Sequence, residues 1–469
     1  MRSKISPQPP PPPQQPPQPL PVSPLPLPQM DAASMDAELT TKRRKGKEVL
    51  QAEINHMDAK RTTKRRKGKE VLQAEINPCT FQRSTANELE MKRSIDGNSR
   101  HQDLTAHIHS LLAVRLEDEQ WTQSGRIPIL FGTHEPSGKR VAVKVQIASH
   151  QAKREVEVMK RLRDVAQPHA APFIIGFVAD ATAAGWHFIA MEALGTSEKP
   201  AVEWMTLMLG PEPEPGAPKP PRPEPVPLET TAQLFADSLV GLSYMHAAGV
   251  VHLDIKSQNI MVAPRTGDST DGNGGYYGGP PPRYAVRLID FGQSRVTMQP
   301  ITGVRGSLSY MAPEMLVPSL VGISGASYNG ISGAIAYDGA KADVWALGVV
   351  LFSSTFHFFP VDSAAPGDKT FVRIRAAQDT GRSTCRTALA FYGRSADEFP
   401  PTLLALIDRL LIVHAPSRPT LHEACGAALP WLEGACPRSA QLVRAVIEVA
   451  ANDDLKAANA IARVVAEVA

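Results

Sequence analysis

The chain has 469 residues, of which 42% are hydrophobic, enough for one large folded domain with additional segments. Residues 1–100 carry 18 Lys and Arg against 11 Asp and Glu, so a basic segment of net charge +7 precedes a remainder of net charge −4. Four cysteines without CxxC spacing argue against a disulfide framework or a zinc site, and the lack of an 18-residue apolar run argues against a membrane span, so we expect a soluble, intracellular protein.

Residues 1–100 are predicted to be a disordered tail. Proline occupies 13 of the 22 positions from 7 to 28, which removes the hydrogen-bond donors that helices and sheets require. Such a segment is suited to proteins that bind proline motifs. Its start carries no apolar segment of the kind that a secretory signal contains.

A tandem duplication follows, with units at residues 35–56 and 57–78 that share the sequence TTKRRKGKEVLQAEIN. The basic cluster in each unit is typical of nuclear import or of contact with nucleic acid, and a solvated tail duplicated without a function explains it equally well. Because the tail lacks the aromatic side chains that stack on bases, nucleic acid is not an expected partner. Cytoplasm and nucleus both remain open as locations.

From residue 126 the pattern becomes rich in strands. The segment RIPILFGTHEPSGKRVAVKVQI predicts two strands joined by a turn at residues 135–139. The next segment, KREVEVMKRLRDV, predicts a helix because Val156, Met159 and Leu162 recur at helical spacing. A further strand is expected at WHFIAMEALG.

Helical patterns dominate the second half. The segment TTAQLFADSLVGLSYMHAAGV predicts an amphipathic helix whose apolar side holds Leu234, Phe235, Leu239, Leu242 and Met245. Pro- and Gly-rich composition predicts surface insertions near residues 210–227, 264–283 and 316–338. Residues 438–469 are expected to form two short helices joined at 452–454, which either pack on the large lobe or form a hairpin that binds a partner.

Five polar residues suggest phosphoryl transfer when they are considered together. Lys144 lies on the apolar strand VAVKV, and Glu155 on the following helix can pair with it. Asp254 and Asn259, at the ends of DIKSQN, offer a carboxylate for a hydroxyl proton and an amide oxygen for Mg²⁺. Asp290 in LIDFGQS closes a strand, as a metal-binding carboxylate would. Transfer of phosphate from ATP needs all of these groups.

From about residue 105 to 433, the sequence resembles a eukaryotic protein kinase domain. The family motifs occur in order, with VAVK at Lys144, REVEVMK at Glu155, HLDIKSQN at Asp254, DFG at Asp290, APE at Glu314, DVWALG at Asp343 and RPT at Arg418. The resemblance implies an α+β, bilobal fold, with a small β-rich lobe over about 105–194 and a large helical lobe over about 195–433. It also implies ATP and Mg²⁺ as cofactors and protein Ser or Thr hydroxyls as acceptors.

The resemblance also implies roles for individual residues. The catalytic residues would be Asp254, Lys256 and Asn259, and the metal ligands Asn259 and Asp290. The ATP site would comprise Lys144, Glu155, Gly125, Ile127, Ala142, Met191, Glu192, Leu194 and Met261. The structural residues would be Glu314, Asp343 and Arg418. Lys256, together with Ser307 in GSLSYMAPE, is typical of serine/threonine kinases.

Three features depart from the family pattern. In the Gly-rich loop, Gln120 and Thr122 replace the first two glycines and leave Gly125 as the third, which limits how closely the backbone can approach phosphates. Glu155 follows Lys144 in the sequence by only 11 residues, fewer than is common in the family, so Glu157 is an alternative partner. Glu157 would lie about 200° around the helix from Glu155. Leu253 replaces the usual Arg, so we expect activity that depends little on phosphorylation of the activation segment. A pseudokinase scaffold is the alternative function.

Overall fold

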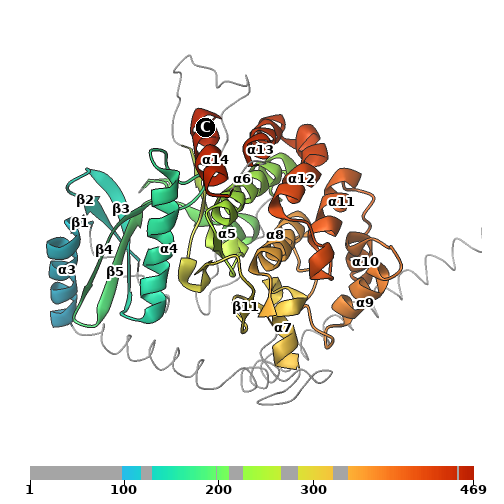
Figure 1. Ribbon diagram of the computed structural model, residues 1–469, viewed down its shortest axis with the longest axis horizontal. Coiled ribbons are helices and arrows are strands. Elements are labelled where there is room, and N and C mark those ends of the chain that lie inside the picture. The colour runs from blue at the N-terminus through green and yellow to red at the C-terminus, as the bar shows by residue number, and fades with distance from the viewer. Residues whose placement is uncertain are drawn as a thin grey trace, which may run out of the picture. The chain divides into compact units, whose positions relative to one another are not determined.

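The computed structural model describes residues 98–117, 129–196, 198–210, 225–265, 284–320, 336–450 and 454–468, with elements labelled as in Figure 1. The predicted disordered tail up to residue 97 lies outside the described residues, and so does the tandem duplication. Gln120, Thr122, Gly125 and Ile127 also lie outside them, as does most of each predicted insertion.

A five-stranded antiparallel sheet forms the small lobe, in the order β1-β2-β3-β5-β4. The strands are β1 (Val114–Leu116), β2 (Ile129–His134), β3 (Lys139–Ile147), β4 (Phe177–Ala183) and β5 (Trp186–Glu192). The turn between β2 and β3 lies where Pro, Ser and Gly predicted it. Side chains alternate along β3, so Val143 and Val145 enter a buried cluster while Lys144 faces the opposite side.

Helix α3 (Asn98–Leu112) contacts β1 and β4 and was missed by the sequence prediction, which ended the tail at residue 100. Ile108 and Leu112 are buried in the same apolar cluster as β3. The sequence did carry a signal for this helix, because Leu104, Ile108, Leu111 and Leu112 recur at helical spacing.

Helix α4 (His150–Ala166) confirms the helix predicted from the spacing of Val156, Met159 and Leu162. The Ser149 side chain accepts the N–H of Ala152 and caps the N-terminus. The buried apolar residues of α4 belong to the large core cluster that also contains helices of the large lobe, not to the cluster of the sheet. Helix α4 therefore packs mainly as part of the large lobe.

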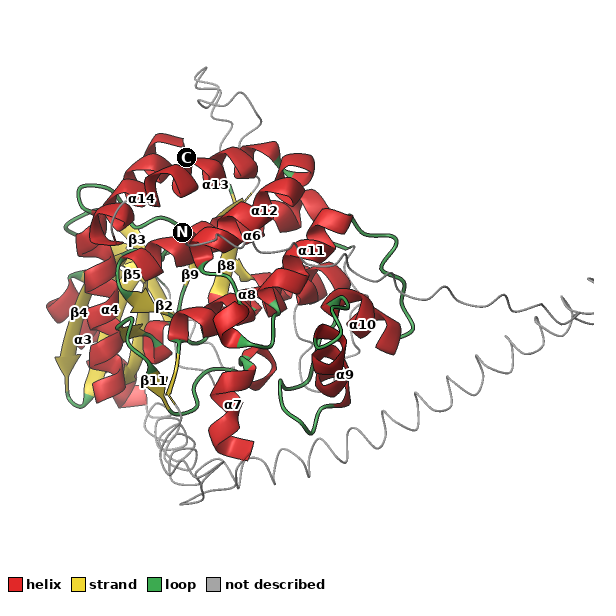
Figure 2. Ribbon diagram, turned by 45° about the vertical axis from the view of Figure 1, so that its right-hand side comes forward, coloured by secondary structure: helices red, strands yellow, loops and turns green. Residues whose placement is uncertain are grey.

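The large lobe is helical, as predicted, and Figure 2 shows its helices grouped away from the sheet. Its helices are α5 (Trp204–Leu209), α6 (Leu228–Ala247), α7 (Pro313–Leu320), α8 (Gly339–Phe356), α9 (Lys369–Gln378), α10 (Thr384–Phe391), α11 (Pro401–Leu410) and α12 (Leu421–Ala435). The prediction that α6 is amphipathic was wrong, because every side chain from Thr230 to Met245 is buried. A helix surrounded by other elements shows no polar face.

Short strands connect the helices and carry the loops of the candidate site. A three-stranded sheet has the order β6 (Val202–Glu203), β8 (Ile260–Pro264), β9 (Tyr284–Leu288). Two further pairs join β7 (Val250–Val251) with β10 (Arg295–Val296) and β11 (Ile301–Thr302) with β12 (Ala336–Tyr337). The β8–β9 hairpin places the segments after β7 and β9 next to each other.

Two C-terminal helices, α13 (Pro437–Ala450) and α14 (Asp454–Val468), follow the predicted bounds closely. Helix α13 contacts α6 and α12, and α14 contacts α13, α6 and α4. The structure thus favours packing on the chain's own helices over an exposed hairpin. Within the described residues, no helix combines the length and apolar character that crossing a membrane requires.

Candidate active site

Lys144 forms a buried ion pair with Glu155. Its Nζ lies 2.7 Å from Glu155 Oε1, and the two side chains are 11% and 2% exposed. Gln146, two residues further along β3 on the same face, donates to Glu155 Oε2 at 3.1 Å. Burial alone would lower the pKa of Lys144, but the charges of Glu155 and Asp290 outweigh this effect and raise it, so the ammonium stays charged.

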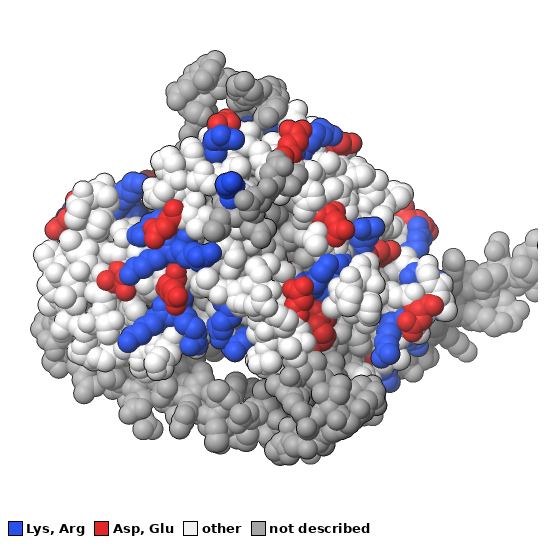
Figure 3. All heavy atoms as spheres, in the orientation of Figure 1, with Lys and Arg blue, Asp and Glu red and all other residues white. Residues whose placement is uncertain are grey.

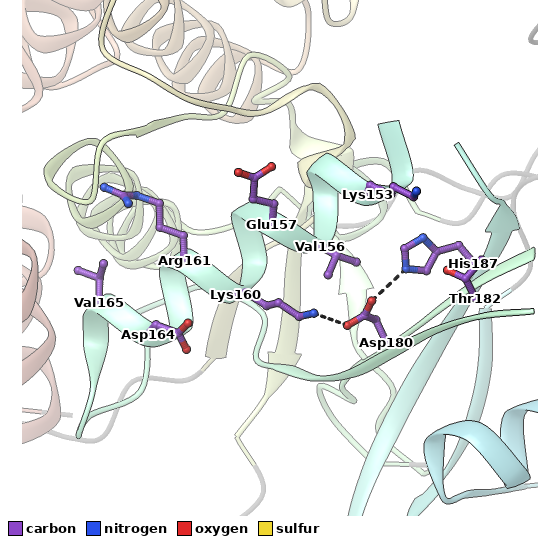
Figure 4. A pocket seen from close by; sticks show the side chains of 10 residues that line it. All are labelled: Lys153, Val156, Glu157, Lys160, Arg161, Asp164, Val165, Asp180, Thr182 and His187. Carbon is purple, nitrogen blue, oxygen red and sulfur yellow. Dashed lines mark hydrogen bonds and ion pairs between the residues drawn. The ribbon is translucent and has the colours of Figure 1, made fainter. Parts of the chain in front are cut away.

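Glu157 does not compete for Lys144. It is exposed and lines a separate pocket between α4 and strands β4 and β5, shown in Figure 4. In that pocket, Lys160 lies 2.6 Å from Asp180, which also contacts His187 at 3.2 Å. Figure 3 shows basic and acidic side chains interleaved over the face that carries α4. None of the predicted catalytic residues lines this pocket.

Asp290 extends the ion pair toward the large lobe. Its Oδ1 accepts a hydrogen bond from Lys144 Nζ at 3.2 Å, and its backbone takes the left-handed conformation with φ 64°. Burial would raise the pKa of Asp290, but the charge and hydrogen bond of Lys144 outweigh it and hold that pKa below its ordinary value. The carboxylate is therefore ionised near neutral pH.

Asp254 lies at the centre of a second polar group, on the loop between β7 and β8. Lys256 Nζ donates to Asp254 Oδ2 at 2.7 Å, and Ser307 Oγ donates to Oδ1 at 3.0 Å. Asn259 Nδ2 donates to the Asp254 backbone carbonyl at 2.9 Å. Because the amide nitrogen of Asn259 faces Asp254, its oxygen remains as an acceptor for another group.

Asp343 on α8 fixes the backbone of this loop. Its Oδ2 accepts the N–H of His252 at 2.8 Å, and its Oδ1 accepts the N–H of Leu253 at 2.7 Å. His246 Nε2 also lies 2.9 Å from Oδ2. Leu253 has a φ of 65°, a conformation that a branched side chain rarely adopts. The two hydrogen bonds hold the residue before Asp254 in this conformation.

The Leu253 side chain is buried in an apolar environment. A Cβ added at Gly339 would lie 3.1 Å from Leu253 Cδ2 and 2.9 Å from Ile301 Cδ1, so these groups pack closely under α8. Leu253 is 4% exposed. Leu253 thus contributes to the apolar core beneath α8.

Three arginines, two of them in the segment after Asp290, lie near one another. Arg154, Arg295 and Arg305, which we call the arginine cluster, come from α4, β10 and the segment after β11. Burial and the charges of Arg305 and Arg154 lower the pKa of Arg295 to about 10. The Nε atoms of Arg154 and Arg305 are buried and lack a hydrogen-bond partner among the described residues. Such a cluster is suited to an anionic group.

The segment after β5 corresponds to the predicted adenine site. Glu192 donates its N–H to the Gly176 carbonyl at 2.7 Å, and its carboxylate pairs with Arg287 at 3.1 Å. No acceptor for the Leu194 N–H is found among the described residues. Ala142 pairs in register with Met191. Met261 lies on β8, a strand of the large lobe. An N–H at this edge that has no acceptor among the described residues can bind a purine nitrogen.

Glu314 and Arg418 form a bidentate ion pair with distances of 2.7 and 3.1 Å. The Arg418 side chain has no solvent exposure, and it also donates to the carbonyls of Ile412 and Lys341. Its guanidinium lies over Trp345. This pair joins the start of α7 to the segment before α12.

The donor set suits ATP with Mg²⁺. Asn259 and Asp290 offer hard oxygen ligands, and Mg²⁺ takes few protein ligands because substrate phosphates and water complete its shell. No group of three or more His, Cys, Asp or Glu side chains arranged for a metal ion occurs in the part of the chain that the structure describes. A site with one carboxylate and one amide is consistent with that finding.

Some residues of the site were missed by sequence reasoning. Gln146 could have been found from its period-two spacing to Lys144 on β3. His246 and Arg287 carried no such signal, because their partners Asp343 and Glu192 are 97 and 95 residues away in the chain.

A family model described as "Protein kinase domain" matches residues 128–431. The chain is 25% identical over 194 residues to serine/threonine-protein kinase PSK1 of Saccharomyces cerevisiae, covering 40% of this chain and 10% of that protein. It is 28% identical over 196 residues to CBL-interacting protein kinase 4 of Oryza sativa, covering 41% and 35%.

A third relative is the DNA damage response protein kinase DUN1 of Saccharomyces cerevisiae, 27% identical over 201 residues, covering 42% of this chain and 34% of that protein. The chain therefore spans between about a tenth and about a third of the length of these relatives.

Proposed function

The chain belongs to the protein kinase family, and we propose that it is an ATP-dependent serine/threonine protein kinase. The observation that carries the proposal is the continuous set of contacts from Glu155 through Lys144 to Asp290, beside a separately fixed Asp254. Protein kinases use this set to bind ATP, while an inactive relative has no need to keep it intact.

In the proposed mechanism, Lys144 binds the α and β phosphates of ATP, and Glu155 holds the ammonium in place. Glu192 and Leu194 bond adenine through their backbone, between Ala142 and Met261, with Met191 behind it. Asn259 and Asp290 would hold Mg²⁺, which supplies neutralising charge at the phosphate oxygens. The low pKa of Asp290 supports this role because the ligand must be ionised.

Asp254 would orient the acceptor hydroxyl and accept its proton. Lys256, 2.7 Å from that carboxylate, would neutralise the γ phosphate during transfer. The bond from Ser307 to Asp254 supports Ser and Thr as acceptors, since it places a small hydroxyl residue of the GSLSYMAPE segment beside the catalytic loop. Gly125 and Ile127 would cover the nucleotide.

The proposed partners are protein substrates, together with proteins that recognise the Pro-rich segment. The proposed location is cytoplasm or nucleus, with the duplicated basic units as a nuclear-import signal. The nuclear fraction of the full chain with both basic clusters mutated, compared with that of the wild type, tests the proposed import signal.

A turnover experiment separates a kinase from a scaffold that only binds nucleotide. The full chain is incubated with ATP, Mg²⁺ and a generic basic protein substrate, beside Asp254→Asn. We expect Asp254→Asn to lower turnover at least about 10²-fold, because general-base and positioning contributions have this size, while the affinity for Mg²⁺-ADP stays within about twofold. Equal, background-level phosphate incorporation by both proteins would favour the scaffold.

A further inference from the structure

Helix α4 carries Glu155 in its first half, so its position decides whether the ion pair with Lys144 can close. The pairs Glu155–Lys144 and Lys160–Asp180 join α4 to the sheet, whereas the apolar face of α4 belongs to the large core cluster that includes the large-lobe helices. The position of Glu155 therefore also depends on the contacts that fix the C-terminal half of α4 against the large-lobe helices.

Three side chains link the second half of α4 to other helices by donating hydrogen bonds to backbone carbonyl groups. The Tyr244 hydroxyl on α6 donates to the carbonyl of Leu162, and Arg161 of α4 donates to the carbonyl of Ala248 at 2.7 Å. The third is Asn459 of α14. Its Nδ2 donates to the carbonyls of Val165 at 3.2 Å and Gln167 at 2.7 Å.

The two bonds of Asn459 act on the end of α4, where carbonyl groups lack partners within the helix. Two carbonyl oxygens can only be satisfied by the NH₂ group of the amide, so the neighbours determine how Asn459 is oriented. An Asp at this position would present a carboxylate to two carbonyl oxygens and repel them. The cap therefore depends on the amide and not on side-chain size.

Helix α14 is itself anchored by burial. Its residues Ala457, Ala458, Ile461, Ala462 and Val465 are buried, and most belong to the large core cluster. Arg438 at the start of α13 donates to the carbonyl of Val468 at the end of α14. Figure 1 shows α14 close to α6 and α13, and contacts with α4 complete its packing. Because its apolar face is covered by its own chain, α14 has a fixed position from which to hold α4.

Helices α13 and α14 lie beyond residue 431, where the match to the kinase family model ends. We propose that the α13–α14 pair positions α4 for catalysis, with Asn459 as the positioning residue that keeps Glu155 within reach of Lys144. This inference rests on the proposed kinase function for its activity readout only. It also gives a reason why Leu253 can replace Arg, since α4 is then fixed from the C-terminal side without a phosphate.

The test uses the full chain with Asn459→Asp, which opposes the carbonyls, and Asn459→Ala, which only deletes the cap. Arg463→Ala is the matched control, because Arg463 is exposed on the same helix. We expect kcat/KM to fall about tenfold for Asn459→Asp, equivalent to about 1.4 kcal/mol, and about threefold for Asn459→Ala. Arg463→Ala should stay within about 1.5-fold of the wild type.

A double-mutant cycle distinguishes positioning from general destabilisation. In a Glu155→Gln background the ion pair is already lost, so Asn459→Asp should lower kcat/KM less than about twofold further. A loss of the same size in both backgrounds would overturn the proposal. Thermal unfolding of each variant identifies any that do not fold, and Asn459→Ala then replaces Asn459→Asp in the cycle.

Hydrogen exchange gives a readout that does not depend on phosphate transfer. Amide groups of residues 150–160 should exchange faster in Asn459→Asp than in wild type or Arg463→Ala, because the whole helix loosens when its end is released. Unchanged exchange in α4 would overturn the positioning role even if the chain is a kinase. Faster exchange in a chain that transfers no phosphate would support positioning and refute the proposed activity.

Discussion

Replacing Asp343 with Asn substitutes an NH₂ group for one carboxylate oxygen, with almost no change in side-chain volume. In the structure both oxygens accept backbone N–H groups, from His252 and Leu253, and one of them also lies against His246. An Asn keeps one acceptor and turns a donor toward the other N–H. One buried N–H then loses its partner, and the remaining bond loses its charge.

The expected cost is about 2–4 kcal/mol of folding free energy, because a buried donor without a partner costs about 1–3 kcal/mol and bonds to charged groups exceed neutral ones. The conformation of Leu253 adds a consequence for catalysis. A non-glycine residue at positive φ stores about 1–3 kcal/mol, so Leu253 relaxes when the bond that holds it is lost. Asp254 is the next residue and moves with it.

Urea unfolding and steady-state kinetics measure the two effects separately. We expect a lower unfolding midpoint and a fall in kcat of about 10²-fold, the size associated with a misplacement of about 1 Å. Asp338→Asn is the matched control, since Asp338 caps the start of the same helix and Asn caps equally well. The reasoning is refuted if Asp343→Asn unfolds within about 0.5 kcal/mol of Asp338→Asn and keeps full kcat.

Burial raises the pKa of Asp237 to about 7, so between about pH 4 and pH 7 the folded state binds more protons than the unfolded state, and stability falls as pH rises. Asp237→Asn should remove about 3 kcal/mol of the stability difference between pH 5 and pH 8, measured by unfolding at both pH values, and an unchanged slope would contradict the assignment. Arg418→Met should cost about 3–5 kcal/mol in urea unfolding, because Glu314 is left as a largely buried charge without its partner; a loss under about 1 kcal/mol would contradict this. A variant with Thr297→Ala and Thr302→Ala should keep at least about half of its turnover, since neither hydroxyl is needed if α4 is positioned by α14. A loss above tenfold would instead indicate that a phosphate on one of them binds the arginine cluster.

The bilobal fold could be predicted because its strands and helices keep their periodicity. The segment VAVKV alternates on a strand with one buried face, and α4 shows its apolar spacing clearly. For helix α6, apolar periodicity did not predict which side chains are buried. Its apolar residues formed a pattern, but Ser238, Ser243 and Asp237 are buried too, and their burial depends on neighbours that are distant in sequence.

The family motifs supplied the candidate site residues from the sequence, but the contacts that these residues make required the structure. The choice between Glu155 and Glu157 required the structure, because spacing alone shows only that the two face different directions. Asn459 gave no signal, since a lone Asn in an apolar helical pattern has no partner until α14 meets the end of α4. Long-range contacts of this kind are not encoded in local composition.

The proposed activity is the transfer of phosphate from ATP to Ser and Thr hydroxyls through Asp254. Phosphoamino-acid analysis of a labelled protein substrate, after incubation of the full chain with ATP and Mg²⁺, tests it most directly. We expect phosphoserine and phosphothreonine with the wild type and neither above background with Asp254→Asn. Label on tyrosine, or equal label with both proteins, would contradict it.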